Sequence, residues 1–255
     1  MNILCTNDDG YLAAGLRLLA AAARSLGTVT VVAPDREQSA TSHSLTLHHP
    51  LRARRGADGG WVVDGTPTDC VILAVNELLE ERADVCVSGV NHGPNMGEDV
   101  FYSGTVAAAV EGALRGAAGI ACSLAPRAKH VDHAIGFAAE VVRAAIEEPI
   151  PAGTVLNVNM PGSGSDQYQW TTLGRRLYED DVAEREDPRG RPYYWVGGGP
   201  AGHDDVEGSD CVAVARGWNS ITPMHLDITD RGRVAQPPWS VAGFHVVVGP
   251  DATPG

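Results

Sequence analysis

The sequence predicts a three-layer α/β protein, in which a mostly parallel, Rossmann-like sheet lies between two layers of helices. Three observations lead to this prediction. Short apolar runs alternate with helical stretches through the first 161 residues. The run at 83–90 is apolar almost throughout, as is typical of a strand covered on both faces. The chain has 255 residues and 44% hydrophobic residues, enough to bury a core of this class.

The first strand–helix–strand unit spans residues 3–33. Residues 3–6 form an apolar strand, and the Asn-Asp-Asp-Gly sequence at 7–10 predicts the turn that ends it. Apolar side chains at 13–26 follow the 3.6-residue period of a helix, which Gly27 ends. The β-branched residues at 28–33 predict the second strand, which stops at Pro34.

Residues 61–160 continue this alternation. A strand at 61–64 leads to a helix at 67–79, for which Thr66 is a cap, Pro67 suits the first turn and Asp69 adds a favourable negative charge. Further strands are predicted at 83–90, 119–124 and 154–160, and further helices from 104 to about 115 and at 131–146. Strands that alternate with helices in this way form right-handed βαβ units.

The composition changes after Pro161, where Gly, Pro and charged residues become frequent. We expect β segments at 193–196, 211–215 and 220–222, and a frayed tail at 249–255. We therefore divide a single domain into an α/β catalytic core at 1–161 and a β-rich part at 162–255. The second part is expected to complete the core and to form an oligomer interface, because it has little room for a core of its own.

The charge and the cysteines exclude several classes of protein. With 19 Lys and Arg against 32 Asp and Glu, the net charge is −13, which counts against binding of nucleic-acid polymers. No apolar run approaches the ~20 residues that span a bilayer, and the start of the chain has no basic region typical of a secretory signal. Five scattered cysteines, mostly within apolar runs, indicate reduced thiols and a cytoplasmic protein.

Polar, glycine-rich motifs follow several predicted strands, at the sheet edge where open parallel sheets bind their ligands. The first contains Asp8 and Asp9, which the turn at Gly10 can bring toward one point. Two carboxylates that lie so close repel each other unless a cation lies between them, and oxygen ligands suit Mg²⁺ or Mn²⁺. The alternative is an ordinary surface turn.

Two further motifs offer ligands for a phosphate. After the strand at 83–90, Asn91 offers a carbonyl oxygen to a cation and Asn95 offers an amide to an anion. His92 is more typical of an exposed loop residue than of a ligand. Ser103, Gly104 and Thr105 begin a predicted helix, whose free N–H groups and dipole can bind an anion. We expect Ser103 and Thr105 to face the anion rather than the cation. Capping alone would also explain Ser103.

A fourth motif follows the strand at 28–33. It offers Ser39 as a neutral metal ligand and Arg36 as a phosphate partner. A solvated polar loop is the alternative. Each motif is weak alone, but four of them at strand ends indicate one site.

These motifs resemble those of the SurE family of survival proteins, and the resemblance covers about residues 1–230. The segments that carry it are Asn7-Asp8-Asp9-Gly10, Ala33-Pro34-Asp35-Arg36 with Ser39, Gly65-Thr66-Pro67-Thr68-Asp69-Cys70, Ser88-Gly89-Val90-Asn91 with Gly93-Pro94-Asn95, Tyr102-Ser103-Gly104-Thr105, Asn157-Val158-Asn159-Met160-Pro161, and Ser220-Ile221-Thr222-Pro223-Met224-His225-Leu226-Asp227. Together they are specific, although no single segment would be.

The resemblance implies a metal-dependent phosphatase of nucleoside monophosphates, a 5'-nucleotidase that also accepts 3'-nucleotides and polyphosphate. It implies one divalent ion per subunit, Mg²⁺ or Mn²⁺, held by Asp8, Asp9, Ser39 and Asn91. Its substrate would contact Asn7, Asn95, Ser103, Gly104 and Thr105. It also implies a homodimer or homotetramer, built partly by exchange of carboxyl-terminal segments.

The expected reaction is metal-assisted hydrolysis of a phosphomonoester, with in-line attack by water. Asp8 or Asp9 would orient or deprotonate the water, and His225 is a candidate acid for the leaving group. Direct attack by Asp8 on phosphorus is the alternative chemistry.

Two other functions also use acidic clusters and metals. A phospho-receiver signalling module needs only half this length, and Asp64 fits its acceptor position poorly. A nucleotide-sugar transferase would hold a diphosphate through a metal.

Overall fold

The computed structural model describes residues 1–178, 182–196 and 201–232. Within these ranges nine strands form one mixed, mostly parallel sheet, which confirms the predicted fold class. In sheet order they are β3 (Ala53–Arg55), β4 (Trp61–Val63), β2 (Thr28–Pro34), β1 (Asn2–Thr6), β5 (Val85–His92), β6 (Ala118–Leu124), β7 (Thr154–Met160), β13 (Asn219–His225) and β8 (Tyr168–Trp170). β3 and β13 run antiparallel to β4 and β7, whereas β8 runs parallel to β13.

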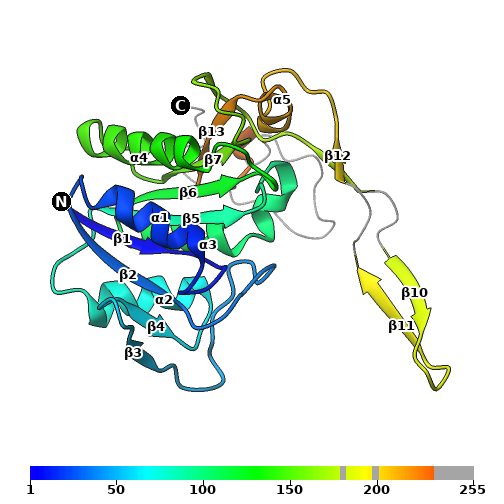
Figure 1. Cartoon of the computed structure of the whole chain (residues 1–255), viewed down its shortest axis with the longest axis horizontal. Coiled ribbons are helices and arrows are strands. Elements are labelled where there is room, and N and C mark those ends of the chain that lie inside the picture. The colour runs from blue at the N-terminus through cyan, green and yellow to red at the C-terminus, as the bar shows by residue number, and fades with distance from the viewer. Residues whose placement is uncertain (179–181, 197–200, 233–255) are drawn as a thin grey trace, which may run out of the picture.

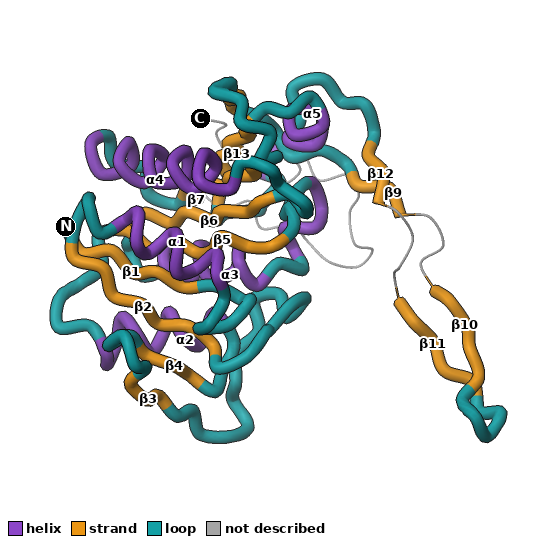
Figure 2. The backbone as a smooth tube through the Cα atoms, viewed as in Figure 1, coloured by secondary structure: helices purple, strands orange, loops and turns teal. Residues whose placement is uncertain are grey.

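Helices cover both faces of the sheet (Figures 1 and 2). α1 (Ala14–Ala23) and α4 (Val131–Glu147) pack together on one face. α2 (Pro67–Leu73) and α3 (Gly104–Leu114) pack together on the other. The alternation of side chains in β1 supplies both layers: Ile3 and Cys5 join the core beneath α1 and α4, and Leu4 joins the core beneath α2 and α3.

The predicted start of α2 is confirmed as a capping box. The Asp69 amide donates to the Thr66 hydroxyl over 3.1 Å, and the Thr66 amide donates to the Asp69 carboxylate over 2.9 Å. The expected continuation to Leu79 takes another form, because the α-helix ends at Leu73 and a π-helical turn, Ala74–Leu78, follows.

The part after Pro161 contributes directly to the main sheet through β8 and β13. Outside that sheet, β9 (Arg176–Tyr178) pairs with β12 (Ala201–His203), and β10 (Val182–Glu186) pairs with β11 (Pro192–Val196). The hairpin strand expected at 193–196 is thus confirmed, and the β10–β11 hairpin extends away from the sheet (Figure 1).

The β segment predicted at 211–215 is wrong. These residues form a short helix, α5 (Asp210–Ala215), which Ser209 caps by accepting a hydrogen bond from the Val212 amide. A short apolar run fits a strand or a buried helix equally well, so its period could not decide between them. The tail predicted at 249–255 lies outside the described residues.

Two further findings concern the core and the membrane. All five cysteines are free and buried, and burial raises the pKa of the Cys5 and Cys122 thiols to about 12. In the described ranges, no helix has both the length and the apolar character needed to cross a bilayer.

Candidate active site

A cavity of about 540 Å³ opens near the carboxyl ends of β1 and β5. The strand order reverses at this point, because β2 lies on one side of β1 and β5 on the other. Ligands of open α/β sheets bind at such a switch point. Six of the predicted site residues line the cavity: Asp8, Asp9, Ser39, Asn91, Asn95 and Ser103.

Asp8 is buried, with 5% of its surface exposed. Its carboxylate accepts a hydrogen bond from the Thr105 hydroxyl, and its backbone oxygen accepts one from the Gln38 amide over 2.7 Å. Burial raises the pKa of Asp8, the Thr105 hydroxyl opposes that shift, and the charge of Asp9 adds to it. A buried carboxylate with a like charge beside it is costly unless a cation compensates.

Asp9 is more accessible than Asp8 and shares the cavity with it. Its carboxylate accepts a hydrogen bond from the His92 amide over 3.2 Å. Burial raises the pKa of Asp9, the His92 amide lowers it, and the charge of Glu37 raises it. His92 is the last residue of β5, with an exposed side chain and a backbone amide that positions Asp9.

Asn91 and Ser39 complete the predicted ligand set. The Asn91 side-chain amide donates to the Gly93 carbonyl over 2.8 Å, so its own carbonyl oxygen keeps no partner within the described part of the chain. Ser39 is exposed, and its hydroxyl donates to the Glu37 carboxylate over 2.7 Å. Asn91 therefore has a free oxygen for a cation, whereas Ser39 must turn from Glu37 to serve as a ligand.

The donor set suits a hard divalent cation. Carboxylate, amide carbonyl and hydroxyl oxygens are the ligands that Mg²⁺ and Mn²⁺ prefer. Among the described residues, no group of three or more His, Cys, Asp and Glu side chains is placed to hold a metal. An ion at this site would therefore rest on the Asp8 and Asp9 carboxylates and on neutral oxygens.

The amino end of α3 lies beside Asp8. Ser103 caps the helix, because its hydroxyl accepts a hydrogen bond from the Val106 amide over 3.1 Å. Gly104 permits the close approach to Asp8, since a Cβ atom at this position would lie 2.9 Å from the Asp8 Cβ. The amino end of α3 thus lies beside the Asp8 carboxylate, and a helix amino end favours a bound anion.

Asn95 is fixed by a buried asparagine network that our sequence analysis did not identify. Its backbone amide donates to the Asn159 side chain over 2.8 Å. Its backbone carbonyl accepts from the side-chain amides of Asn157 and Asn159 over 2.8 and 2.9 Å. Its side-chain nitrogen donates to the Ser123 hydroxyl over 2.8 Å. The Asn-Val-Asn sequence at the end of β7 was the available signal, because residues two apart share one face of a strand.

Four predicted residues do not line the cavity: Gly104 and Thr105, which lie in the first turn of α3, and Asn7 and His225. Asn7 is fully buried and its side-chain amide donates to the Gly10 carbonyl over 3.0 Å, so it shapes the turn that presents Asp8 and Asp9. His225 pairs with Thr154 at the amino end of β7, because β13 runs antiparallel to β7. The carboxylates follow the carboxyl end of β1, at the other edge of the sheet, so the structure does not bring His225 to them within this chain.

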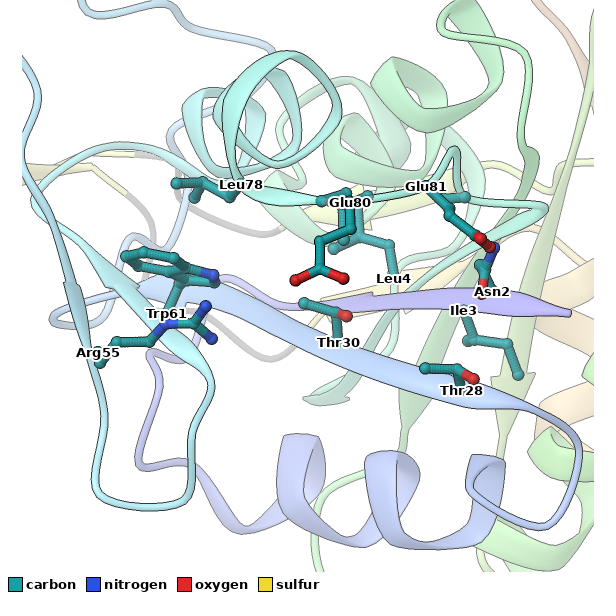
Figure 3. Close-up of a pocket in the computed structure, with 12 residues that line it drawn as sticks. Asn2, Ile3, Leu4, Thr28, Thr30, Arg55, Trp61, Leu78, Glu80 and Glu81 are labelled. Carbon is teal, nitrogen blue, oxygen red and sulfur yellow. The ribbon is translucent and has the colours of Figure 1, made fainter.

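Another cavity, of about 360 Å³, lies against the first residues of β1 and β2 (Figure 3). The Arg55 guanidinium stacks over the Trp61 ring, with 3.9 Å from its central carbon to the ring centroid. Glu80 turns its carboxylate toward the same space (Figure 3). None of the predicted site residues lines this cavity.

Comparisons with known proteins agree with the geometry. A family model described as survival protein SurE matches residues 3–180. The chain is 50% identical over 249 residues to the 5'-nucleotidase SurE of Myxococcus xanthus (strain DK1622), with 95% of each chain covered. It is 52% identical over 239 residues to the 5'-nucleotidase SurE of Gemmatimonas aurantiaca, with 91% of this chain and 95% of the relative covered. The crystal structure of the SurE protein from Aquifex aeolicus matches with a TM-score of 0.80 and 39% identity, over 91% of this chain and 96% of that one.

Proposed function

Because this chain belongs to the survival protein SurE family, we propose that it is a divalent-metal-dependent phosphomonoesterase, a 5'-nucleotidase. It hydrolyses nucleoside monophosphates to nucleosides and inorganic phosphate. One observation carries the assignment: the paired carboxylates of Asp8 and Asp9 and the amino end of α3 line the same cavity. A site of this kind can hold a cation and a phosphate side by side.

The proposed metal ligands are Asp8, Asp9, Ser39 and Asn91, with one Mg²⁺ or Mn²⁺ ion per subunit. When bound, the ion supplies charge neutralisation at the phosphate and acidifies a water for attack. The raised pKa values of Asp8 and Asp9 support this assignment, because a cation removes the penalty of burying two adjacent charges.

The proposed phosphate contacts come from Asn95, Ser103, Gly104 and Thr105. The helix terminus offers N–H groups without partners in the helix, and its dipole favours a negative charge. Asn95 lies in the loop after β5, and the asparagine network fixes its backbone before substrate binds. Such donors stabilise developing charge at no cost of rearrangement.

We assign orientation of the attacking water to Asp9. Asp9 is the more accessible carboxylate, whereas Asp8 is 5% exposed and is bonded to Thr105. For the same reason we favour water over Asp8 as the nucleophile. Trapping of a phospho-enzyme during turnover tests this choice, because attack by Asp8 would form an aspartyl-phosphate, whereas direct attack by water forms no covalent intermediate.

We also propose that the enzyme is a cytoplasmic homodimer or homotetramer. Every residue of β10 and β11 is exposed, including Tyr193, Tyr194 and Trp195. An exposed apolar patch of this kind is typical of a surface that pairs with another subunit. The five free, buried thiols support a reducing compartment.

Phosphate release from nucleoside monophosphates tests the function directly. We expect activity with Mg²⁺ or Mn²⁺ and none after chelation, with recovery on reloading. 3'-Nucleotides and short polyphosphates in the same assay define the range of esters accepted. Phosphate release that persists after thorough chelation, or no release from any nucleoside monophosphate when metal is present, would contradict the proposal.

A further inference from the structure

Tyr178 brings an aromatic ring to the cavity from a distant part of the chain. It is the last residue of β9, and it lines the cavity together with Asp8, Asp9 and Ser103. Half of its surface, 50%, is exposed. A tyrosine that is half exposed beside a polar catalytic cavity presents an apolar ring face to whatever occupies that cavity.

The orientation of Tyr178 is fixed through Asp99, a residue of η2 (Gly97–Phe101). The Tyr178 hydroxyl donates to one oxygen of the Asp99 carboxylate, and the Arg176 guanidinium donates to the other over 3.0 Å. The side chains of Arg176 and Asp99 are only 12% and 19% exposed. Since its hydroxyl is held at this buried pair, the ring cannot turn freely into solvent.

A second set of contacts keeps β9 against η2. The Arg176 amide donates to the Glu98 carboxylate over 2.8 Å, and the Arg176 guanidinium carbon lies 5.8 Å from the centroid of the Tyr178 ring. Burial and the Asp99 carboxylate both raise the pKa of Tyr178, so the hydroxyl remains protonated and can donate at neutral pH.

The segment that holds Tyr178 also leads into the phosphate site. η2 ends at Phe101, and the chain passes through Tyr102 to Ser103, the cap of α3. Tyr102 is 66% exposed and lines the same cavity. Only three residues of chain separate Asp99, which holds the Tyr178 ring, from Ser103 at the phosphate site.

We propose that Tyr178 is a specificity-determining residue, whose ring stacks on the nucleobase of the substrate, and that Asp99 is its positioning residue. The inference rests on the proposed nucleotidase function. With the phosphate at the amino end of α3, the nucleoside would extend into the cavity that the Tyr178 ring lines. Stacking on an aromatic side chain accepts any base, because every base has a π face.

Hydrolysis of AMP and of ribose 5-phosphate, which lacks the base, tests the proposal. In Tyr178→Ala we expect the ratio of kcat/KM for AMP to that for ribose 5-phosphate to fall about tenfold, within the range known for one stacked base. The loss should appear mainly as a higher KM for AMP. Tyr178→Phe keeps the ring and should retain most of the ratio, whereas Asp99→Asn should lower it by less than Tyr178→Ala. Tyr168→Ala, an exposed tyrosine on β8, is the matched control.

The outcomes separate the two proposals. An active Tyr178→Ala enzyme with an unchanged ratio would overturn the nucleobase contact alone. A fall in the ratio for Tyr178→Phe as large as for Tyr178→Ala would also overturn it, because the ring is then not the recognition element. A wild-type chain that released phosphate from neither ester in the presence of metal would overturn the nucleotidase function, and this inference with it.

Discussion

The hydroxyl of Thr105 donates a hydrogen bond to the carboxylate of Asp8. This contact joins the turn after β1 to the first turn of α3, so the proposed metal ligand and the proposed phosphate site form one unit. The sequence alone predicts that Thr105 faces the anion rather than the cation. Because its hydroxyl is bonded to a proposed metal ligand, we expect Thr105 to act on both sides of the site.

Thr105 and Ser103 should therefore differ when they are replaced. In Thr105→Val, which keeps the shape of the side chain, we expect metal affinity to fall about tenfold or more, as is usual for loss of a group that orients a metal ligand. Ser103→Ala should raise KM with little change in metal affinity, because Ser103 caps the helix and does not contact the carboxylates. Mn²⁺ titration of both variants and their steady-state kinetics check this. Equal metal affinity in the two variants would remove Thr105 from the metal site.

The Asn95–Asn159 contact should stabilise both the fold and the catalytic loop. Asn159→Ala removes two hydrogen bonds to the Asn95 backbone and leaves a buried amide without a partner. We expect a loss of about 1–3 kcal/mol in unfolding free energy, and a fall of about tenfold in kcat because the loop after β5, which carries Asn95, loosens. Denaturant unfolding and kinetics measure both effects. Asn76→Ala, at an exposed position, is the control, and an Asn159→Ala protein as active as this control would contradict the account.

Without metal, the Asp8–Asp9 pair should destabilise the protein at neutral pH. The pKa of Asp9 is raised in the folded state, so its stabilising contribution is present at low pH and is lost as the pH rises above the ordinary value of 3.8. Asp9→Asn cannot ionise, so the metal-free variant should melt at the same or a higher temperature than the wild type, with a difference that grows with pH. Thermal melts in chelator between pH 4 and about 8 measure it. A difference that shrinks as the pH rises would contradict the cause assigned to the shift.

The sequence was sufficient for those parts of the fold that depend on local signals. The strand–helix alternation, the Thr66 cap and the Ser103 cap follow from residues close together in the chain, and the structure confirms them. Local signals also placed Asp8 and Asn91 at neighbouring strand ends, where parallel strands bring them into one cavity.

The parts that the sequence did not predict depend on long-range pairing. The antiparallel direction of β13 places His225 at the edge of the sheet away from Asp8 and Asp9, and no local pattern sets that direction. The contact of Tyr178 with Asp99 joins residues 79 positions apart. α5 is a helix partly because the Asp210 carboxylate accepts bonds from the Gly97 and Gly174 amides, which fixes the start of a run that could also form a strand.

The central claim is that Asp8 and Asp9 hold a divalent ion in the cavity, and a Mn²⁺ binding titration tests it most directly. The titration compares the wild type, Asp9→Asn and the matched surface control Asp205→Asn in metal-free buffer. We expect one Mn²⁺ per chain in the wild type and the control, and at least tenfold weaker binding in Asp9→Asn, because one of two charged ligands is removed while the shape is kept. Binding to Asp9→Asn with the affinity and stoichiometry of the wild type would contradict the claim.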